Sequence, residues 1–172
     1  MSIHSIRGLT DSDWLEYKTI RLRSLQDSPD SFGSTYEREA VFQVEQWQAR
    51  LKGSASVRDA VTLAAFSGDS CVGLLSCVIS DDVTRRAQLY QMWVAPENRR
   101  KGVGISLVNH AKQWAYKRNI RTLVLSVTTV NAEAISLYKS NGFVPTGETE
   151  PLRQGSSLES QTMEAKLNAN DS

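Results

Sequence analysis

One short turn carries the residues best suited to bind an anion: it reads Arg99-Arg100-Lys101-Gly102-Val103-Gly104 and leads into an amphipathic stretch. The first backbone N–H groups of a helix have no partner inside it, and the macrodipole adds roughly half a positive charge there. Because Gly102 and Gly104 have no Cβ, an anion can approach the backbone closely. We therefore predict a diphosphate site here, although a solvated basic helix start explains these residues equally well.

The elements on either side must position this turn. An apolar strand over Leu89–Val94 precedes it, and Pro96 breaks the chain between the two. After the turn, a helix is predicted from four apolar residues on one face of a 3.6-residue period: Val103, Leu107, Ala111 and Trp114. A buried-looking strand over Thr122–Val127 follows the helix. A strand, a crossover helix and a second strand predict a parallel pair at this point.

Two common nucleotide-binding patterns are not met at the turn. The third glycine of the Rossmann pattern G-x-G-x-x-G is replaced by Leu107. The P-loop pattern G-x-x-x-x-G-K-[ST] fails as well. What remains is Arg99-x-x-Gly102-x-Gly104, so the predicted diphosphate belongs to some other ligand class.

The rest of the chain alternates helical and strand patterns without a repeat or a linker. We predict an α+β domain with a mixed sheet, mostly antiparallel with one parallel pair near its centre, and about four helices. The further expected elements are a strand within Ser2–Leu9, a helix after the caps Thr10–Asp13 that stops at Asp27–Asp30, a helix over Tyr36–Leu51 capped by Ser34 or Thr35, a loop over Lys52–Ser56, a hairpin of Val61–Phe66 and Cys71–Ile79, a helix over Ala132–Asn141 capped by Asn131, a strand from Phe143 and a last strand within Leu158–Leu167.

Composition narrows the class of protein. The net charge of +1 gives no general case for nucleic acid or an anionic membrane as a partner. Cys71 and Cys77 share one predicted strand, roughly 20 Å apart, whereas a disulfide needs Cα atoms within about 7 Å. Two free thiols, no long apolar run and no leader-like N-terminus predict a cytoplasmic protein. No spacing typical of metal ligands is present, so no metal is expected.

A second motif lies downstream: it runs from Asn131 to Phe143 and reads NAEAISLYKSNGF. Together, the two motifs resemble those of the GNAT superfamily of acetyl-CoA-dependent N-acetyltransferases. The first is similar to the family's acetyl-CoA motif, and the second to its N-x-x-A-x-x-x-Y-x-x-x-G-F stretch. The resemblance implies a single GNAT domain over residues 1–167, with a splayed parallel strand pair; residues 168–172 are expected to form a flexible tail.

The resemblance also implies roles for individual residues. The diphosphate of acetyl-CoA would lie on the N–H groups from Arg100 to Gly104, with Arg99 and its neighbours adding charge. The pantetheine arm would pair with the backbone of Met92, Trp93 and Val94, where an N–H group can also hold the thioester oxygen. Asn131 and Ala134 would contact the arm. Tyr138, two turns along the same helix face, would be the general acid that protonates the leaving thiolate, whose pKa is about 8.5 by analogy with cysteine.

The general base has no clear candidate. An alkyl amine has a pKa near about 10.4 and must lose a proton before it attacks. Some relatives carry a Glu where this chain has Gln88, and neither Gln88 nor Gln91 can accept a proton. A water chain or another acid could serve instead; the candidate acids are Glu37, Glu39, Glu148 and Glu150. An aromatic pair, Phe32 and Tyr36, is expected to contact the acceptor or to pack in the core.

The leading hypothesis is an enzyme that moves acetyl from acetyl-CoA to a primary amine of a small molecule, by direct attack in a ternary complex. The near-neutral charge gives no dedicated surface for a polymer, which favours a small acceptor over a protein N-terminus or lysine. The alternative is a non-catalytic acyl-CoA-binding or sensing module, favoured by Gln88 and opposed by Tyr138. Either a monomer or a homodimer fits the sequence.

Overall fold

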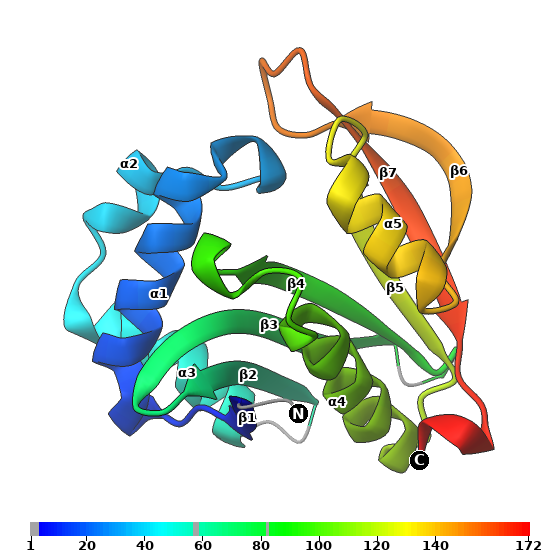
Figure 1. The fold of residues 1–172 in the computed structure, drawn as a ribbon, viewed down its shortest axis with the longest axis horizontal. Coiled ribbons are helices and arrows are strands. Elements are labelled where there is room, and N and C mark those ends of the chain that lie inside the picture. The colour runs from blue at the N-terminus through cyan, green and yellow to red at the C-terminus, as the bar shows by residue number, and fades with distance from the viewer. Residues whose placement is uncertain (1–3, 57–58, 82) are drawn as a thin grey trace.

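The computed structural model describes residues 4–56, 59–81 and 83–172, in which seven strands form one sheet in the order β1-β2-β3-β4-β5-β7-β6 (Figure 1). All neighbouring strands are antiparallel except β4 and β5, which are parallel. The predicted mixed sheet with one parallel pair is therefore confirmed. The strands are β1 His4–Gly8, β2 Ala60–Ser67, β3 Ser70–Asp81, β4 Arg86–Val94, β5 Thr122–Thr128, β6 Val144–Pro151 and β7 Glu159–Lys166. Ser2 and Ile3 of the predicted first strand lie outside the described residues.

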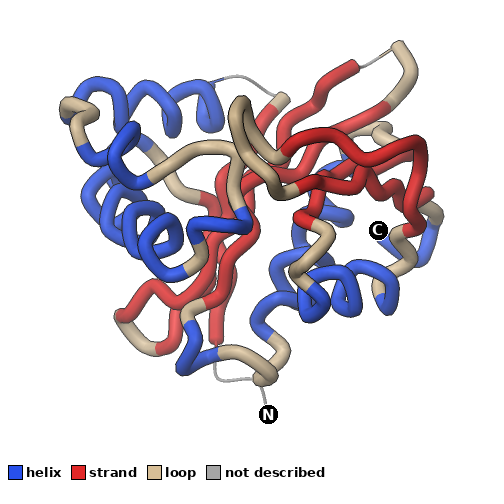
Figure 2. The backbone as a smooth tube through the Cα atoms, turned by 90° about the horizontal axis from the view of Figure 1, so that it is seen from above, coloured by secondary structure: helices blue, strands red, loops and turns tan. Residues whose placement is uncertain are grey.

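Among the described residues, five α-helices cover the two faces of this sheet. Figure 2 shows α1, α2 and α3 on one side of the strands, and α4 and α5 on the other. The helices are α1 Trp14–Asp27, α2 Tyr36–Ala40, α3 Val44–Ser56, α4 Val103–Lys117 and α5 Ala132–Ser140. Short 3-10 turns lie at Asp11–Asp13, Pro29–Ser31, Pro96–Asn98 and Ala169–Asp171.

Predicted cap residues lie at the start of α5 and at the 3-10 turn that leads into α1. Thr10 forms a capping box with Asp13, whose carboxylate accepts the Thr10 backbone N–H at 2.8 Å. At α5, the Asn131 side chain accepts the Ala134 backbone N–H at 3.2 Å. Thr35 caps α2 by accepting the Arg38 N–H. The N-termini of α2 and α5 are thus capped by their own side chains, whereas α1 continues from the capped 3-10 turn Asp11–Asp13.

One long helix over Tyr36–Leu51 was a wrong prediction, because the chain breaks between α2 and α3. Gln43 directly precedes α3, and its backbone N–H donates to the Gln46 side-chain oxygen at 2.8 Å, which satisfies a backbone donor at the start of α3. The break turns Phe42 inward, with its ring centroid 5.6 Å from that of Trp47. The predicted loop over Lys52–Ser56 is also wrong, since α3 continues to Ser56.

The helix after the basic turn packs closely on the sheet. Val103, Leu107 and Ala111 are buried as predicted. A Cβ on Gly73 of β3 would lie only 3.0 Å from Leu107, so this glycine sets the approach of α4 to β3. Both cysteines lie on β3 as free thiols.

The end of the chain contacts α4. Residues Ala169–Asp171 form a 3-10 turn, and the Asp171 carboxylate lies 3.5 Å from the Lys112 ammonium. The predicted boundary at residue 167 and the flexibility of residues 168–172 stay predictions.

Candidate active site

The parallel pair opens into a cleft near the centre of the sheet. β4 and β5 pair only where Arg86–Gln88 faces Thr122–Val124. Beyond these positions the two strands diverge, as the ribbon shows (Figure 1). The edge of β4 from Leu89 to Val94 therefore has no ladder with β5. The opening has a volume of about 1840 Å³ and is lined by both strands and by the beginnings of α4 and α5.

A bulge re-aims β4 at the cleft. Leu74 pairs with Trp93 but Ser76 pairs with Tyr90, so β4 contains one residue more than β3 over this stretch. The extra residue lets Gln91 adopt a left-handed backbone, with φ of 60°. Its side-chain oxygen accepts the buried Tyr17 hydroxyl at 2.9 Å, which anchors the strained residue to α1.

The basic turn is built from left-handed residues. Arg100 has φ of 59° and Gly102 has φ of 82°, and a Cβ on Gly102 would meet no atom within 4 Å. Gly102 is thus required by its backbone conformation, and the turn can direct successive N–H groups to one anion. Gly104 has a different task, because its Cβ would lie 3.1 Å from both Met92 and Leu137. It allows α4 to approach β4 and α5, a packing role that the sequence argument did not assign.

The Arg99 side chain is directed to protein groups. Its Nε donates to the Val94 carbonyl at 2.9 Å, and its Nη2 donates to Asp27 at 2.7 Å. Asp27 also accepts the Trp93 indole N–H at 3.0 Å. Burial raises the pKa of Asp27, but hydrogen bonds from Ser28, Trp93 and Arg99 outweigh it and hold that pKa below its usual range. The charge of Arg99 is therefore paired with that of Asp27, and the expectation that Arg99 adds charge for the diphosphate stays a prediction.

The other predicted cofactor residues lie around the same opening. Met92, Trp93, Val94, Arg99, Arg100, Gly102, Val103, Gly104, Asn131, Ala134 and Tyr138 all line the cleft. The Arg100 side chain is exposed and lies 3.9 Å from Glu133. Lys101 is exposed and does not line the cleft. The Asn131 amide donates to Ser31 at 3.3 Å, which ties α5 to the connection between α1 and α2.

Tyr138 is buried at the wall of the cleft. Only 6% of the residue is exposed, and its ring packs against Phe143 with centroids 5.7 Å apart. Burial raises the pKa of the Tyr138 phenol above its usual value, so the hydroxyl keeps its proton throughout the neutral range. Within the part of the chain that the structure describes, this hydroxyl has no hydrogen-bond partner. It is therefore a free proton donor facing the cleft.

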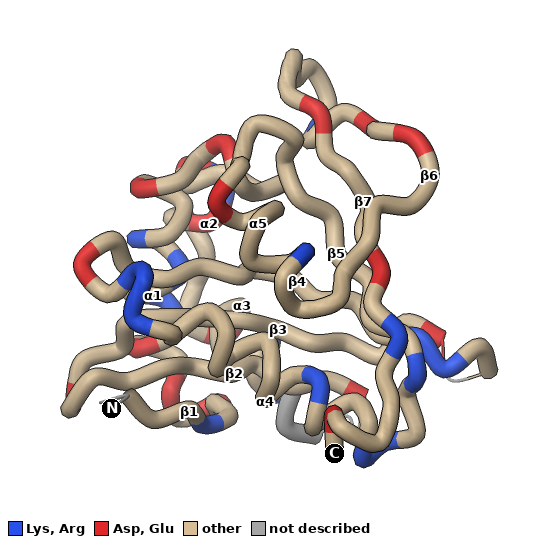
Figure 3. Tube along the Cα trace, turned by 45° about the vertical axis from the view of Figure 1, so that its right-hand side comes forward, with Lys and Arg blue, Asp and Glu red and all other residues tan. Residues whose placement is uncertain are grey.

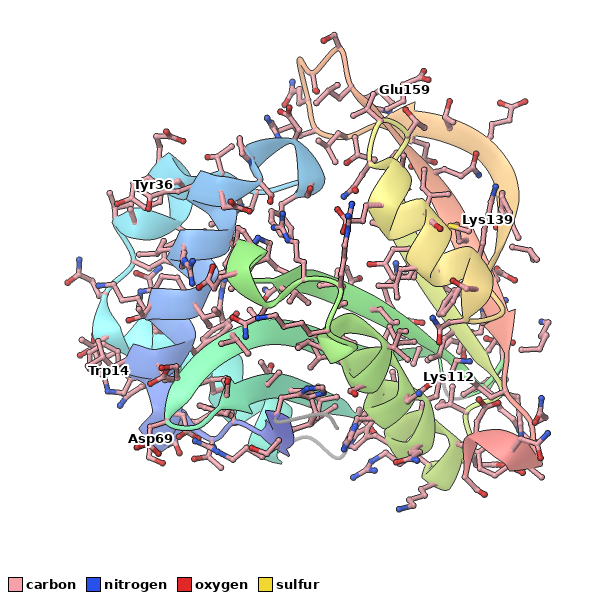
Figure 4. The ribbon with its side chains drawn as sticks, viewed as in Figure 1. Trp14, Tyr36, Asp69, Lys112, Lys139 and Glu159 are labelled. Carbon is pink, nitrogen blue, oxygen red and sulfur yellow. The ribbon has the colours of Figure 1, made fainter. Side chains whose placement is uncertain are left out.

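The aromatic pair from the first helices is separated. Phe32 is buried, lines the cleft, and lies against the Arg21 guanidinium, 4.8 Å from the ring centroid to Cζ. Tyr36 does not line the cleft; it begins α2 at the outer edge of the helical layer (Figure 4) and packs partly against the core. Acceptor contact by either residue stays a prediction.

Sequence reasoning missed a buried ionic cluster at one end of the cleft. The Glu39 carboxylate accepts Nε and Nη2 of Arg21, each at 3.0 Å, and Nη1 of Arg50 at 3.0 Å. The signal was present in the sequence, since Arg21 follows Tyr17 by four residues and therefore belongs to the apolar face of α1. A charged residue on a core-facing stripe requires a buried partner.

The cluster also decides among the candidate bases. Burial raises the pKa of Glu39, but the hydrogen bond and charge of Arg21, with Ser34 and Arg50, outweigh it and hold that pKa below its usual range. Glu39 is therefore a poor base. Of the other three, Glu150 lines the cleft, whereas Glu37 and Glu148 do not. Gln88 lines the cleft, as expected from its place on β4.

The geometry of the described residues shows neither a cluster that could hold a metal ion nor a helix that could cross a membrane. Among residues 4–56, 59–81 and 83–172, no group of three His, Cys, Asp or Glu side chains is arranged to hold a metal ion. No described helix combines the length and apolar character that crossing a membrane requires.

Comparison with known proteins fits this geometry. The model of the Acetyltransferase (GNAT) family matches residues 20–143. The chain is 34% identical over 103 residues to streptothricin acetyltransferase of Streptomyces lavendulae, covering 60% of this chain and 54% of that protein. It is 32% identical over 101 residues to human N-acetyltransferase 8, covering 57% and 44% of the two chains. The chain thus spans about half the length of these curated relatives.

The fold agrees as well. A GNAT-family acetyltransferase of Streptococcus pneumoniae superposes with a TM-score of 0.84 at 22% identity, over 96% of this chain and 99% of that one. Nourseothricin acetyltransferase matches with a TM-score of 0.59 at 31% identity, over 64% and 66% of the two chains. The family model matches residues 20–143, which are most of this chain, and the sheet has a splayed parallel pair. This chain therefore belongs to the GNAT acetyltransferase family.

Proposed function

We propose that this protein transfers acetyl from acetyl-CoA to a primary amine of a small molecule, by direct attack in a ternary complex. The observation that carries the proposal is the cleft between β4 and β5. It brings together an unpaired strand edge, a glycine turn at a helix start and the buried Tyr138 hydroxyl. A strand edge suits an extended amide-bearing chain, and the helix start suits a diphosphate.

The residues present fit the shape of acetyl-CoA. The backbone edge of Met92–Val94 would pair with the pantetheine amides, and N–H groups of Arg100–Gly104 would bind the diphosphate. Asn131 and Ala134, at the start of α5, would border the arm. N-acetyltransferase of Thermoplasma acidophilum, which shares the fold with a TM-score of 0.71, was crystallised in complex with coenzyme A.

Each part of the cleft has a chemical task in this proposal. Acetyl-CoA supplies an activated thioester, and a β4 backbone N–H would stabilise negative charge on its oxygen. Tyr138 would give its proton to the sulfur that leaves. Because burial raises the pKa of Tyr138, the phenol acts as an acid and does not act as a base.

The proton of the attacking amine requires a separate route. Glu39 is held by two arginines, and Gln88 cannot accept a proton. We propose that the amine is neutralised by water in the open cleft before it attacks. Below the pKa of the amine, kcat/KM should then rise roughly tenfold per pH unit. Glu150→Gln should leave this profile unchanged; a plateau near pH 7 that Glu150→Gln abolishes would assign the base to Glu150.

Two kinds of relative bear on the acceptor. The name of streptothricin acetyltransferase gives a small molecule as the acceptor, which supports the main proposal. A second candidate acceptor is a protein N-terminus. The [ribosomal protein bS18]-alanine N-acetyltransferase of Escherichia coli is 40% identical to this chain over 65 residues, which are 38% of this chain and 44% of that protein.

The experiment that tests the proposal is thiol release from acetyl-CoA with two panels, small primary amines and peptides with N-terminal alanine. Faster release with small amines supports the main proposal, whereas faster release with the peptides supports the second candidate. Calorimetry measures CoA binding in parallel. If CoA binds and no member of either panel releases thiol, the chain is an acyl-CoA-binding module and the proposal is refuted.

The two free thiols of Cys71 and Cys77 support a reducing, cytoplasmic setting. Sedimentation would distinguish a monomer from a homodimer.

A further inference from the structure

The ionic cluster of Arg21, Glu39 and Arg50 carries more positive than negative charge. Two guanidinium groups share the single Glu39 carboxylate. The side chains of Arg21 and Glu39 are 4% and 1% exposed, respectively, whereas that of Arg50 is 34% exposed. All three residues line the cleft. Within the cluster, two positive charges thus face one negative charge at the cleft wall, with Arg21 buried and Arg50 partly exposed.

One donor of this cluster has no partner. Nη1 of Arg21 is buried and makes no hydrogen bond to the described residues, although Nε and Nη2 of the same guanidinium both bind Glu39. A buried donor without an acceptor destabilises the fold, and more so when the donor is charged. Such a group calls for an explanation, and a bound ligand that accepts the hydrogen bond is one. An oxygen-bearing anion is the ligand that satisfies both the free N–H and the excess charge.

We propose that the acceptor amine also carries a carboxylate, which binds the cluster of Arg21 and Arg50. Arg50 supplies the exposed cation through which the acid group enters, and Arg21 supplies the buried donor. The Phe32 ring, which lies against the Arg21 guanidinium, borders this acid-binding end. The inference rests on the proposed N-acetyltransferase activity, because it names the class of amine that the same cleft accepts.

The other charged residues of the cleft suit an acceptor that carries both an ammonium group and a carboxylate. Asp30, Asp59 and Glu150 also line it and can attract the ammonium group before the amine loses its proton. Over the whole chain, acidic and basic residues are interspersed (Figure 3), so the net charge of +1 creates no strong general field. Selection for an acid group must therefore come from the local cluster. A polyamine, which has no acid group, should be a poor acceptor.

The test compares matched acceptors and matched variants. Each ω-amino acid from glycine to 6-aminohexanoate is paired with its primary amide, which keeps the amine and removes the charge. Arg21→Gln removes the buried donor and leaves the Arg50–Glu39 pair, so that the remaining cluster is neutral. Arg50→Gln removes the exposed cation and leaves the Arg21–Glu39 pair. Arg7→Gln is the control, because Arg7 makes a similar two-bond ion pair with Asp13 and does not line the cleft.

We expect the wild type to favour at least one acid over its amide by about tenfold or more in kcat/KM. Arg21→Gln and Arg50→Gln should each bring that ratio close to one while CoA affinity stays unchanged, and Arg7→Gln should keep the ratio. A wild-type ratio at or below one overturns the proposal. So does a ratio that both cleft variants retain. If Arg21→Gln does not fold, as judged by lost CoA binding, Arg50→Gln decides.

Failure of the activity itself gives a different result. If no amine of any kind releases thiol, the proposed function fails, and binding alone then tests the acid site. Calorimetry on the CoA-saturated protein compares N-acetyl-6-aminohexanoate and its shorter homologues with their amides. Tighter binding of the acids that Arg50→Gln removes supports the site. Equal binding, or no binding of either series, overturns it.

Discussion

Tyr138→Phe is the substitution that most directly tests the proposed chemistry. It removes the hydroxyl and keeps the ring, which is 6% exposed and packs against Phe143. Since the hydroxyl has no hydrogen-bond partner among the described residues, its loss leaves no protein group unsatisfied. The free energy of unfolding should therefore change by less than about 0.5 kcal/mol.

The rate should change far more than the stability. A positioned general acid contributes about 10²–10⁴-fold to a rate, which equals about 2.7–5.5 kcal/mol of transition-state free energy at about 1.36 kcal/mol per factor of ten. The loss should fall on kcat, because the hydroxyl acts on the leaving sulfur and not on binding. It should also shrink above pH 9, where a thiolate leaves without a proton, since its pKa is about 8.5.

The assay is thiol release from acetyl-CoA with a saturating amine, measured from pH 7 to pH 9.5. CoA affinity by calorimetry and the thermal midpoint show whether the cleft is intact. Tyr116→Phe is the matched control, because Tyr116 lies on α4 outside the cleft. A Tyr138→Phe enzyme that turns over at the wild-type rate at pH 7 would refute the general-acid assignment. A deficit that is constant with pH would show that the hydroxyl has another task.

Three further predictions concern the cluster, the turn and a thiol. Glu39→Gln should destabilise the protein by about 3–5 kcal/mol at pH 7, because it leaves the buried Arg21 cation without its carboxylate and also removes the partner of the partly exposed Arg50. Since the pKa of Glu39 is lowered in the folded state, the stabilisation by its carboxylate is present above the unfolded pKa of about 4.3 and is lost as the pH falls through the folded pKa. Urea unfolding at pH 7 and pH 3 measures both the destabilisation and its pH dependence. A difference between wild type and variant that does not change with pH contradicts the pairing. Gly104→Ala should weaken CoA binding and cost about 1–3 kcal/mol by pressing on Met92, and an unchanged free energy of unfolding in urea would contradict the packing role. Gly102→Ala should cost about 1–2 kcal/mol through its backbone alone. Burial raises the pKa of Cys71 from 9.0 to about 11, so iodoacetamide at pH 8 should modify this thiol about a hundredfold more slowly than a free thiol of ordinary pKa. Rapid labelling, followed by mass spectrometry, would contradict the burial of the thiol.

Much of the fold follows from local patterns in the sequence. The parallel pair was predictable because a strand, an amphipathic helix and a second strand leave few other topologies. Asn131 and Thr10 were recognisable as caps because their side chains satisfy nearby backbone groups. The break between α2 and α3 was not recognised, since both halves have helical periodicity and the stop depends on Gln43 and the inward turn of Phe42.

The candidate site was predictable in outline, but the partners of its side chains were not. The guanidinium of Arg99 donates to Asp27, which lies 72 positions away in the sequence, so the motif alone does not reveal this ion pair. Gly104 was assigned to anion approach, whereas its neighbours Met92 and Leu137 come from two other elements. Such long-range contacts leave no local pattern. A sequence motif thus identifies the backbone of a site more reliably than the roles of its charges.

The splayed pair gives this sheet four strand edges instead of two. β1 and β6 form the outer edges, while β4 and β5 each present an inner edge where they part. Exposed edges template the pairing of one protein molecule with another and promote aggregation. Here the inner edges are recessed between α4, α5 and the connection after α1. Hydrogen bonds from Thr128 and Asn131 hold that connection across the opening. A strand of a second protein has side chains on both faces, so the recess keeps it from this edge. A thin, unbranched ligand can still reach the edge. The recess that protects the sheet from aggregation therefore also favours a narrow, unbranched ligand.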